Sequence, residues 1–220
     1  MSIVLVRRIV CACCLLAACA VAPAAEAGGD AVACANLIYA GTRSSVCFSD
    51  RFLSLAARKS TLDTVRKFRP VKLAGDELYR YPFAMMTGEG AFSLTADERV
   101  NLKRYLERGG FLLASAGCSS KQWDASFRRE MKLVFPEQEL AVIPSEHELF
   151  RTIFTIDKLK THGKDARLLG LTIGGKVVLV YSSDGLNDTS TMHGCCCCGG
   201  NEISNSQQVN ANILAYALVQ

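Results

Sequence analysis

Four consecutive cysteines stand between glycines near the end of the chain: Cys195, Cys196, Cys197 and Cys198. Thiolates and imidazoles are ligands that zinc prefers. Alternate side chains of an extended segment point to opposite faces, so one face supplies only two of these thiols. A tetrahedral zinc-type site would then need two further ligands, and His193 and Cys118 are the best candidates. The block therefore indicates a metal or redox site, disulfides to Cys118, Cys34 or Cys47, or small side chains packed in a tight turn.

Two further polar segments follow predicted strands. Residues 182–188, which include Asp184 and Asp188, offer several oxygen ligands but are also typical of a turn. Glu89 lies between two glycines after an apolar run, and it is a second candidate for the same sheet edge. We expect His147 to lie in a loop or at the start of a helix, and His162 to be solvated among lysines.

Residues 1–27 have the layout of a secretory signal peptide, with Arg7 and Arg8 followed by an apolar run and small residues. Residues 16–19 resemble a bacterial lipobox, which would make Cys19 a lipid anchor in the membrane. Cleavage after Ala25 or Ala27 and an uncleaved anchor are the alternatives, and each predicts a periplasmic or otherwise exported domain. We expect residues 28–33 to form a tether and residues 34–220 a single α/β domain.

Cysteine number and charge bear on the partners. Without the leader and Cys19, seven cysteines remain, and an odd number leaves at least one thiol outside an intrachain disulfide. Cys34 and Cys47 flank the first predicted strand, so a disulfide between them is plausible. The formal net charge is +4 and the basic residues are scattered, which argues against nucleic acid as a partner.

Strand and helix patterns alternate along the chain. Apolar runs predict buried strands at 35–40, 82–87, 111–115 and 140–143, and Gly174-Gly175 predicts a late β-hairpin. Helical spacing covers 52–68, closed by Pro70, then a helix capped by Thr95 and Glu98, then 122–134 and the C-terminal segment. This order predicts an α/β fold: a doubly wound, mostly parallel sheet with helices on both faces.

Two stretches of the sequence carry a resemblance to a known family. One runs from Tyr81 to Gly90 and continues through the capped helix to Ala114; the other joins Phe127–Met131, Phe135-Pro136 and residues 144–150. Together they resemble a bacterial family, the domain of unknown function 4159. The resemblance covers about residues 35–219. It implies a flavodoxin-like fold similar to the class I glutamine amidotransferases, and it implies no particular activity.

The amidotransferase resemblance points to Cys118 as a nucleophile. Those enzymes place their cysteine in a Gly-x-Cys-x-Gly turn between strand and helix, where the helix N-terminus favours a thiolate. Here Gly117-Cys118 follows a predicted strand, but Ala116 and Ser120 replace the outer glycines. The partner His-x-Glu is missing, and its nearest equivalents are Asp184, Asp188 and His193. Cys118 as a small buried side chain is the other interpretation.

These observations leave three functions open. The leading hypothesis is a non-catalytic binding or assembly module of the cell envelope, with an envelope protein or a small ligand as its partner. Its site would lie at the C-terminal edge of the sheet, where residues 88–90, 117–120 and 193–200 converge. The alternatives are a Cys-dependent hydrolase or amidotransferase-like enzyme using Cys118 with His193 or Asp184, and a metal-binding or redox protein using the cysteine block.

Overall fold

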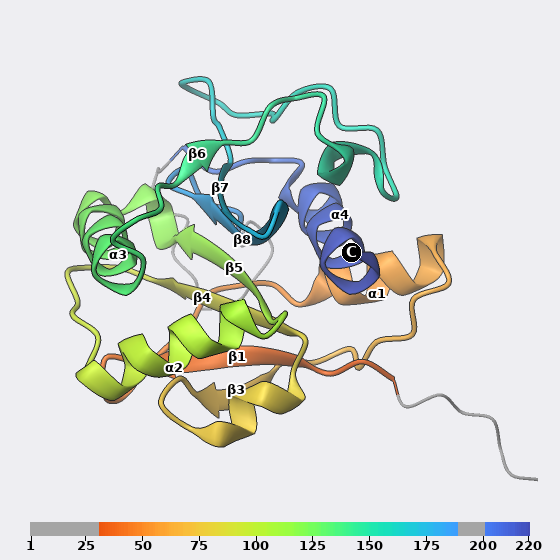
Figure 1. Cartoon of the computed structure of the whole chain (residues 1–220). Helices are drawn as coiled ribbons and strands as arrows, with labels where there is room; N and C mark the ends of the chain where they lie inside the picture. Colours follow the sequence, from red (N-terminus) through yellow and green to blue (C-terminus); the bar gives the residue numbers. More distant parts are fainter. Residues whose placement is uncertain (1–30, 189–200) are drawn as a thin grey trace, which may run out of the picture.

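The computed structural model describes residues 31–188 and 201–220. An eight-stranded, mixed and largely parallel sheet forms its centre, with helices on both faces (Figure 1). The strands are β1 (Cys34–Tyr39), β2 (Arg43–Ser44), β3 (Arg69–Lys72), β4 (Phe83–Gly88), β5 (Phe111–Ala116), β6 (Ala141–Val142), β7 (Leu169–Ile173) and β8 (Lys176–Ser182). The helices are α1 (Arg51–Lys59), α2 (Ala96–Glu107), α3 (Lys121–Val134) and α4 (Ser206–Val219), with short 3-10 turns η1 (Asp76–Arg80), η2 (Gly117–Ser119) and η3 (Glu148–Arg151).

The order of the strands reverses beside β1. The order is β2-β1-β4-β5-β8-β7-β6, and β3 also pairs with β1. Residues 35 and 36 of β1 pair with both β3 and β4, so these two strands lie on opposite edges of β1. β3, β1, β4, β5 and β8 run parallel, whereas β7 and β6 add an antiparallel border. The carboxyl ends of the parallel strands therefore meet at one edge, on the left in Figure 1.

Alternation along the strands creates two cores. In β4, Phe83 and Met85 pack with α1 and α4, whereas Ala84 and Met86 pack with α2 and α3. Met85, Met86 and the α3 residue Trp123 are fully buried, as the sequence predicts. A strand with apolar side chains on both faces needs a helical layer on each side, and this requirement explains the two pairs of helices.

Local turn and capping signals are confirmed. Gly174 and Gly175 close the β7–β8 hairpin with φ angles of 58° and 82°, a conformation that disfavours other residues. At the start of α2, the Glu98 amide donates to Thr95 Oγ1 at 3.2 Å and the Thr95 amide donates to Glu98 Oε2 at 2.8 Å. Both ends of this capping box are thus formed.

The predicted helix over 52–68 is wrong in its length. α1 ends at Lys59, and the Ser60 hydroxyl donates to the Ala56 carbonyl at 2.8 Å. The chain then turns back into β3, which contains Pro70. Proline is tolerated there because β3 pairs with β1 on one side only, so its missing N–H faces outward. The predicted strand over 140–143 is likewise shorter, at two residues on the border of the sheet.

Candidate functional site

Three connections meet at the carboxyl edge of the sheet. The Gly90 amide donates to Ser120 Oγ at 3.2 Å, which joins the segment after β4 to the segment after β5. Ser119 Oγ donates to the Asp184 carbonyl at 3.1 Å, which adds the segment after β8. A Cβ atom on Gly117 would lie 3.1 Å from the Gly88 carbonyl oxygen, so the backbones approach closely. The predicted meeting of residues 88–90 and 117–120 is therefore present, whereas residues 193–200 lie outside the described part of the chain.

Cys118 occupies a tight turn between β5 and α3. Its φ and ψ angles are 48° and 31°, and Ser119 follows with a φ of 52°. Two successive left-handed residues other than glycine are rare, and such conformations concentrate at functional sites. Ala116 and Ser120 have ordinary φ angles of −70° and −62°, so the turn needs no glycine at either position. The replaced glycines of the amidotransferase pattern are therefore no obstacle to this turn.

The Cys118 side chain is partly exposed and precedes the N-terminus of α3. Ser120 is the N-cap of α3, and its side chain accepts the Trp123 amide at 3.3 Å. The partial positive charge of a helix N-terminus favours a thiolate over a thiol. The structure thus places Cys118 between β5 and α3, two residues before the N-cap of that helix.

A buried polar network fixes the ends of the strands behind this turn. Asn187 Oδ1 accepts from Ser115 Oγ at 2.6 Å, and Asn187 Nδ2 donates to Thr87 Oγ1 at 3.1 Å and to the Cys47 carbonyl at 2.8 Å. Ser115 and Thr87 are fully buried, and Asn187 is 3% exposed. Sequence reasoning missed this network, although a hydroxyl at the end of two apolar strands was its visible signal. Because its polar atoms bond to one another, the network positions the edge rather than binding a ligand.

A second buried contact requires Gly88. Trp123 Nε1 donates to the Tyr39 hydroxyl at 2.8 Å, and that hydroxyl donates to the Thr87 carbonyl at 2.9 Å. Burial raises the pKa of the Tyr39 hydroxyl, so it remains a neutral donor. A Cβ atom on Gly88 would lie 2.2 Å from the Tyr39 oxygen. Only glycine at this position leaves room for the contact.

The acidic candidates differ in their surroundings. Asp184 lies beside the turn, and its Oδ1 accepts from Asn201 Nδ2 at 3.0 Å. Asp188 instead forms an ion pair at 2.9 Å with Arg51, the first residue of α1. Glu89 is exposed, and its Cγ would lie 3.3 Å from a Cβ on Gly117. Asp184 and Glu89 are therefore the carboxylates nearest to the Cys118 turn that these contacts identify.

The histidines in the described part occupy the positions that the sequence predicts. His147 is the N-cap of η3, where its Nδ1 accepts the Leu149 amide at 3.2 Å. His162 is exposed. Both observations agree with the sequence predictions. His193 lies outside the described residues.

The predicted disulfide between Cys34 and Cys47 is wrong. Cys34 is a free thiol at the start of β1, fully buried, and burial raises its pKa to about 12. Cys47 is disulfide-bonded, and its carbonyl contacts Asn187 at the opposite end of the strands. The two cysteines flank β1 and therefore lie at opposite ends of the strands. Cys34 pairs with Phe83 at the amino end, whereas Cys47 lies at the carboxyl end, so the two sulfur atoms do not meet.

Within 31–188 and 201–220, no three His, Cys, Asp or Glu side chains are grouped to hold a metal ion, and the cysteine block at 195–198 lies outside these ranges.

Comparison with known families identifies the chain. The model of a family described as Domain of unknown function (DUF4159) matches residues 37–218, which is most of the sequence. The chain belongs to the DUF4159 family. A search of curated proteins found no match. The DUF4159 match begins within β1 and ends within α4, so it includes every element that forms the carboxyl edge.

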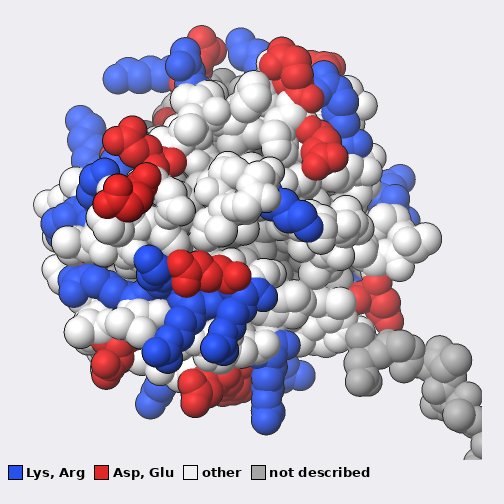
Figure 2. All heavy atoms as spheres, in the orientation of Figure 1, with Lys and Arg blue, Asp and Glu red and all other residues white. Residues whose placement is uncertain are grey.

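The surface of this DUF4159 domain carries both signs of charge. On the face shown in Figure 2, Lys and Arg side chains gather over α2, and Asp and Glu side chains lie among them. Ion pairs within a helix, such as Lys103 with Glu107 and Arg128 with Asp124, account for part of this mixture. Where the chain is described, no helix has the length and apolar character to cross a membrane.

Proposed function

We propose that this DUF4159 domain is an exported, non-catalytic binding module of amidotransferase-like and flavodoxin-like architecture. Its parallel strands have the order β3-β1-β4-β5-β8, which is the 2-1-3-4-5 order of flavodoxin-like folds when they are numbered as they occur. Helices α1 and α4 on one face and α2 and α3 on the other agree with that winding.

The carboxyl edge around Cys118 is the binding site in this proposal. The observation that carries it is the meeting of three turns, at residues 88–90, 117–120 and 183–187. Cys118 and Ser119 both have positive φ angles, which are unfavourable for residues other than glycine. Strained backbone of this kind persists where a rigid scaffold holds it, and open α/β sheets bind ligands at this edge.

Export is supported by the oxidation state of Cys47. Cys47 is disulfide-bonded, and disulfides persist mainly in oxidising compartments outside the cytoplasm. The leader-like residues 1–27 agree with this location. In this proposal, Cys19 anchors the domain to the membrane as a lipoprotein, and an envelope protein or small ligand is the partner. Because the same oxidising compartment would act on every thiol, we propose disulfides rather than a zinc site for the cysteines at 195–198.

A photo-cross-linking side chain at position 89 tests the binding proposal. Glu89 is exposed beside the Cys118 turn, and exposed Lys176 at the other end of the strands is the matched control position. In cells that produce the protein, we expect a discrete adduct from position 89 and none from position 176, with the adduct retained in Cys118→Ser. Equal adducts from both positions would contradict a site at the carboxyl edge.

A second candidate is a Cys-dependent hydrolase or amidotransferase-like enzyme. The specific observation that favours it is the left-handed Cys118 between β5 and α3, at the N-terminus of a helix. In this candidate Cys118 attacks a carbonyl carbon, and Asp184 or His193 takes the thiol proton. The tetrahedral adduct expels the amine or alcohol of the substrate, which takes up that proton, and water then hydrolyses the thioester to a carboxylic acid and the Cys118 thiol.

An activated ester distinguishes the two candidates. With p-nitrophenyl acetate, an enzyme should release a burst of nitrophenolate and carry one acetyl group on Cys118. Cys118→Ala should abolish the burst, whereas Cys34→Ala should retain it because Cys34 is buried in the core. Slow acetylation spread over lysines, and unchanged in Cys118→Ala, would leave the non-catalytic module as the function.

A further inference from the structure

A crevice of about 420 Å³ opens beyond the carboxyl ends of β1 and β4. Its walls come from the turn after β1 and from β2, the segment after β4, and α3, and its lining residues are Ala40, Arg43, Ala91, Phe92, Ser93 and Arg129. The order of the strands reverses between β1 and β4, because β3 and β4 lie on opposite edges of β1. Open α/β sheets bind their ligands in the crevice at such a reversal.

The charged side chains that line this crevice are two arginines. Arg129 is held in place: its Nη2 donates to the Phe92 carbonyl and to Ser93 Oγ, the latter at 3.2 Å. Arg129 Nη2 also lies 3.2 Å from Glu130 Oε1. A guanidinium fixed in this way loses little conformational entropy when it binds an anion.

Two carboxylates beside the crevice already have partners. Glu130 is fully buried and also pairs with Arg99 at 2.7 Å, so one negative charge is shared between two guanidinium groups. Glu98 accepts the amides of Gly41 and Thr95 with its two oxygens. Of the six residues that line the crevice, two are cationic and none is a carboxylate.

Arg43 retains hydrogen-bonding capacity. It is exposed, and its Nη1 donates to the Glu89 carbonyl at 3.4 Å, which is long for such a bond. None of the ion pairs between described residues involves Arg43. Its other N–H groups can therefore serve an incoming anion.

We propose that this crevice binds an oxyanion, such as the phosphate group of a small ligand, between Arg43 and Arg129. A guanidinium presents parallel N–H donors that match two oxygens of a phosphate. Ser93 Oγ accepts from Arg129, so its own hydrogen is available to a third oxygen. The proposal goes beyond the binding module described above, because it needs neither the Cys118 thiol nor an envelope partner.

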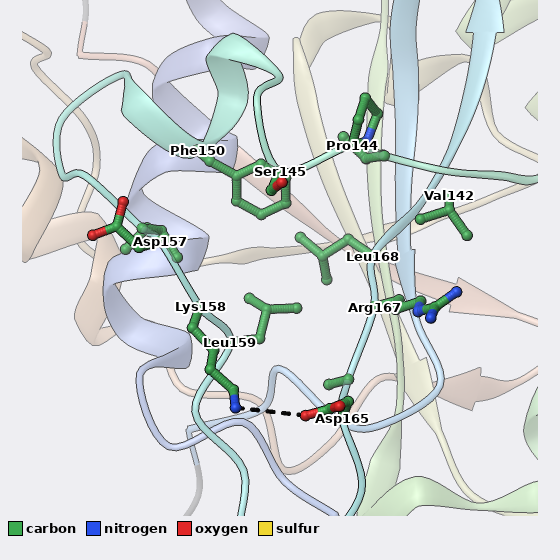
Figure 3. Close-up of a pocket in the computed structure, with 13 residues that line it drawn as sticks. Val142, Pro144, Ser145, Phe150, Asp157, Lys158, Leu159, Asp165, Arg167 and Leu168 are labelled. Atoms are coloured by element: carbon green, nitrogen blue, oxygen red, sulfur yellow. Dashed lines mark ion pairs between the residues drawn. The ribbon is translucent and has the colours of Figure 1, made fainter.

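A second cavity of the described residues provides the contrast (Figure 3). It measures about 360 Å³ and has an apolar floor that includes Phe150, Leu159 and Leu168. Its charged lining is balanced, with Lys158 and Arg167 against Asp157 and Asp165. Lys158 Nζ lies 3.6 Å from Asp165 Oδ1. This cavity has no preference for an anion, so Arg167 is a matched control for Arg43.

The test is a titration with inorganic phosphate at constant ionic strength. Binding is followed by calorimetry and by the NMR resonances of the arginine Nε–H groups. We expect saturable binding that shifts the Arg43 and Arg129 resonances. Arg43→Gln should weaken it about tenfold or more, because hydrogen bonds to charged groups are the strong ones. Arg167→Gln should bind phosphate as the unmodified protein does.

Three results would overturn the proposal. The first is that the unmodified protein shows no saturable binding of phosphate. The second is that Arg43→Gln and Arg167→Gln weaken phosphate binding equally. The third is that phosphate shifts only the resonances of arginines outside the crevice. The phosphate titration needs no macromolecular partner and the cross-linking at position 89 needs no phosphate, so failure here and failure of the proposed binding module remain distinguishable.

Discussion

The two ends of the parallel strands are built differently. At the amino end, Phe83 and Phe111 stack with ring centroids 5.8 Å apart, and Cys34 is buried beside Phe83 as its partner in the sheet. At the carboxyl end, Asn187 Nδ2 donates a hydrogen bond to Thr87 Oγ1 behind the left-handed turn at Cys118. The amino end is apolar core, whereas the carboxyl end is a directional polar frame.

The difference shows how stability and site geometry are divided in this fold. Burial of apolar area is strong but non-directional, so it stabilises the sheet without fixing particular atoms. Hydrogen bonds contribute less net free energy but hold atoms at set distances and angles. Substitutions at the amino end should therefore cost more stability, and those at the carboxyl end should alter the site.

Phe111→Ala should have the largest effect. Phe111 is fully buried and contacts Phe83 and Tyr216. We expect the free energy of unfolding to fall by about 3–5 kcal/mol, the usual range for removing a buried phenyl ring. Urea denaturation measures this loss. A loss below about 1 kcal/mol would show that the amino end is not the main core.

Asn187→Ala should have a smaller effect. It leaves Ser115 Oγ without its acceptor and removes a donor from Thr87 Oγ1 and the Cys47 carbonyl. We expect the free energy of unfolding to fall by about 2–3 kcal/mol. We also expect the Cys118 thiol to be alkylated faster, because the frame behind its turn is loosened. Asn205→Ala, which removes a partly exposed amide, is the control and should cost about 1 kcal/mol or less. Similar losses from the two variants would refute a special role for Asn187.

The buried Cys34 should make stability depend on alkaline pH. Burial raises its pKa from 9.0 to about 12, so the unfolded chain releases the thiol proton first. Its contribution is full below pH 9 and is lost as the pH rises toward 12. At about pH 10.5 this loss is about 2 kcal/mol. Cys34→Ala should lack this part of the pH dependence in urea denaturation; identical pH profiles would contradict the burial of the thiol.

Thr95→Ala should have the smallest effect. It removes one half of the capping box at the exposed start of α2. We expect a loss of about 1 kcal/mol, less than for Asn187→Ala, because water replaces an exposed cap more readily than a buried amide. Thermal unfolding measures it, and a loss larger than that of Asn187→Ala would reverse the ranking.

Local signals made much of the fold predictable. The runs around Met85 and Leu113, the Gly174-Gly175 hairpin and the Thr95 capping box are encoded within a few residues each. The end of α1 was not predictable from apolar spacing, since Leu62 and Val65 continue the spacing after Ser60 has ended the helix. Pro70 then fits an edge strand equally well.

The site was only partly predictable because its contacts join distant segments. Cys118 and residues 88–90 were found because both follow predicted strands. Arg43 and Arg129 carry no local signal, and only the reversal of strand order brings them to one crevice. A disulfide at Cys47 was among the alternatives, but its partner was not predictable for the same reason, since the sequence does not show which cysteines meet in space.

The measurement that tests the central claim most directly is the alkylation of Cys118 and Cys34 by iodoacetamide in one native sample, resolved by peptide mapping. The account predicts that Cys118, partly exposed at the carboxyl edge, reacts in the native state, whereas Cys34 reacts only as fast as the protein unfolds. Urea should accelerate the alkylation of Cys34 alone. Equal rates for the two cysteines, both accelerated by urea, would contradict the claim that the carboxyl edge is the accessible site of this domain.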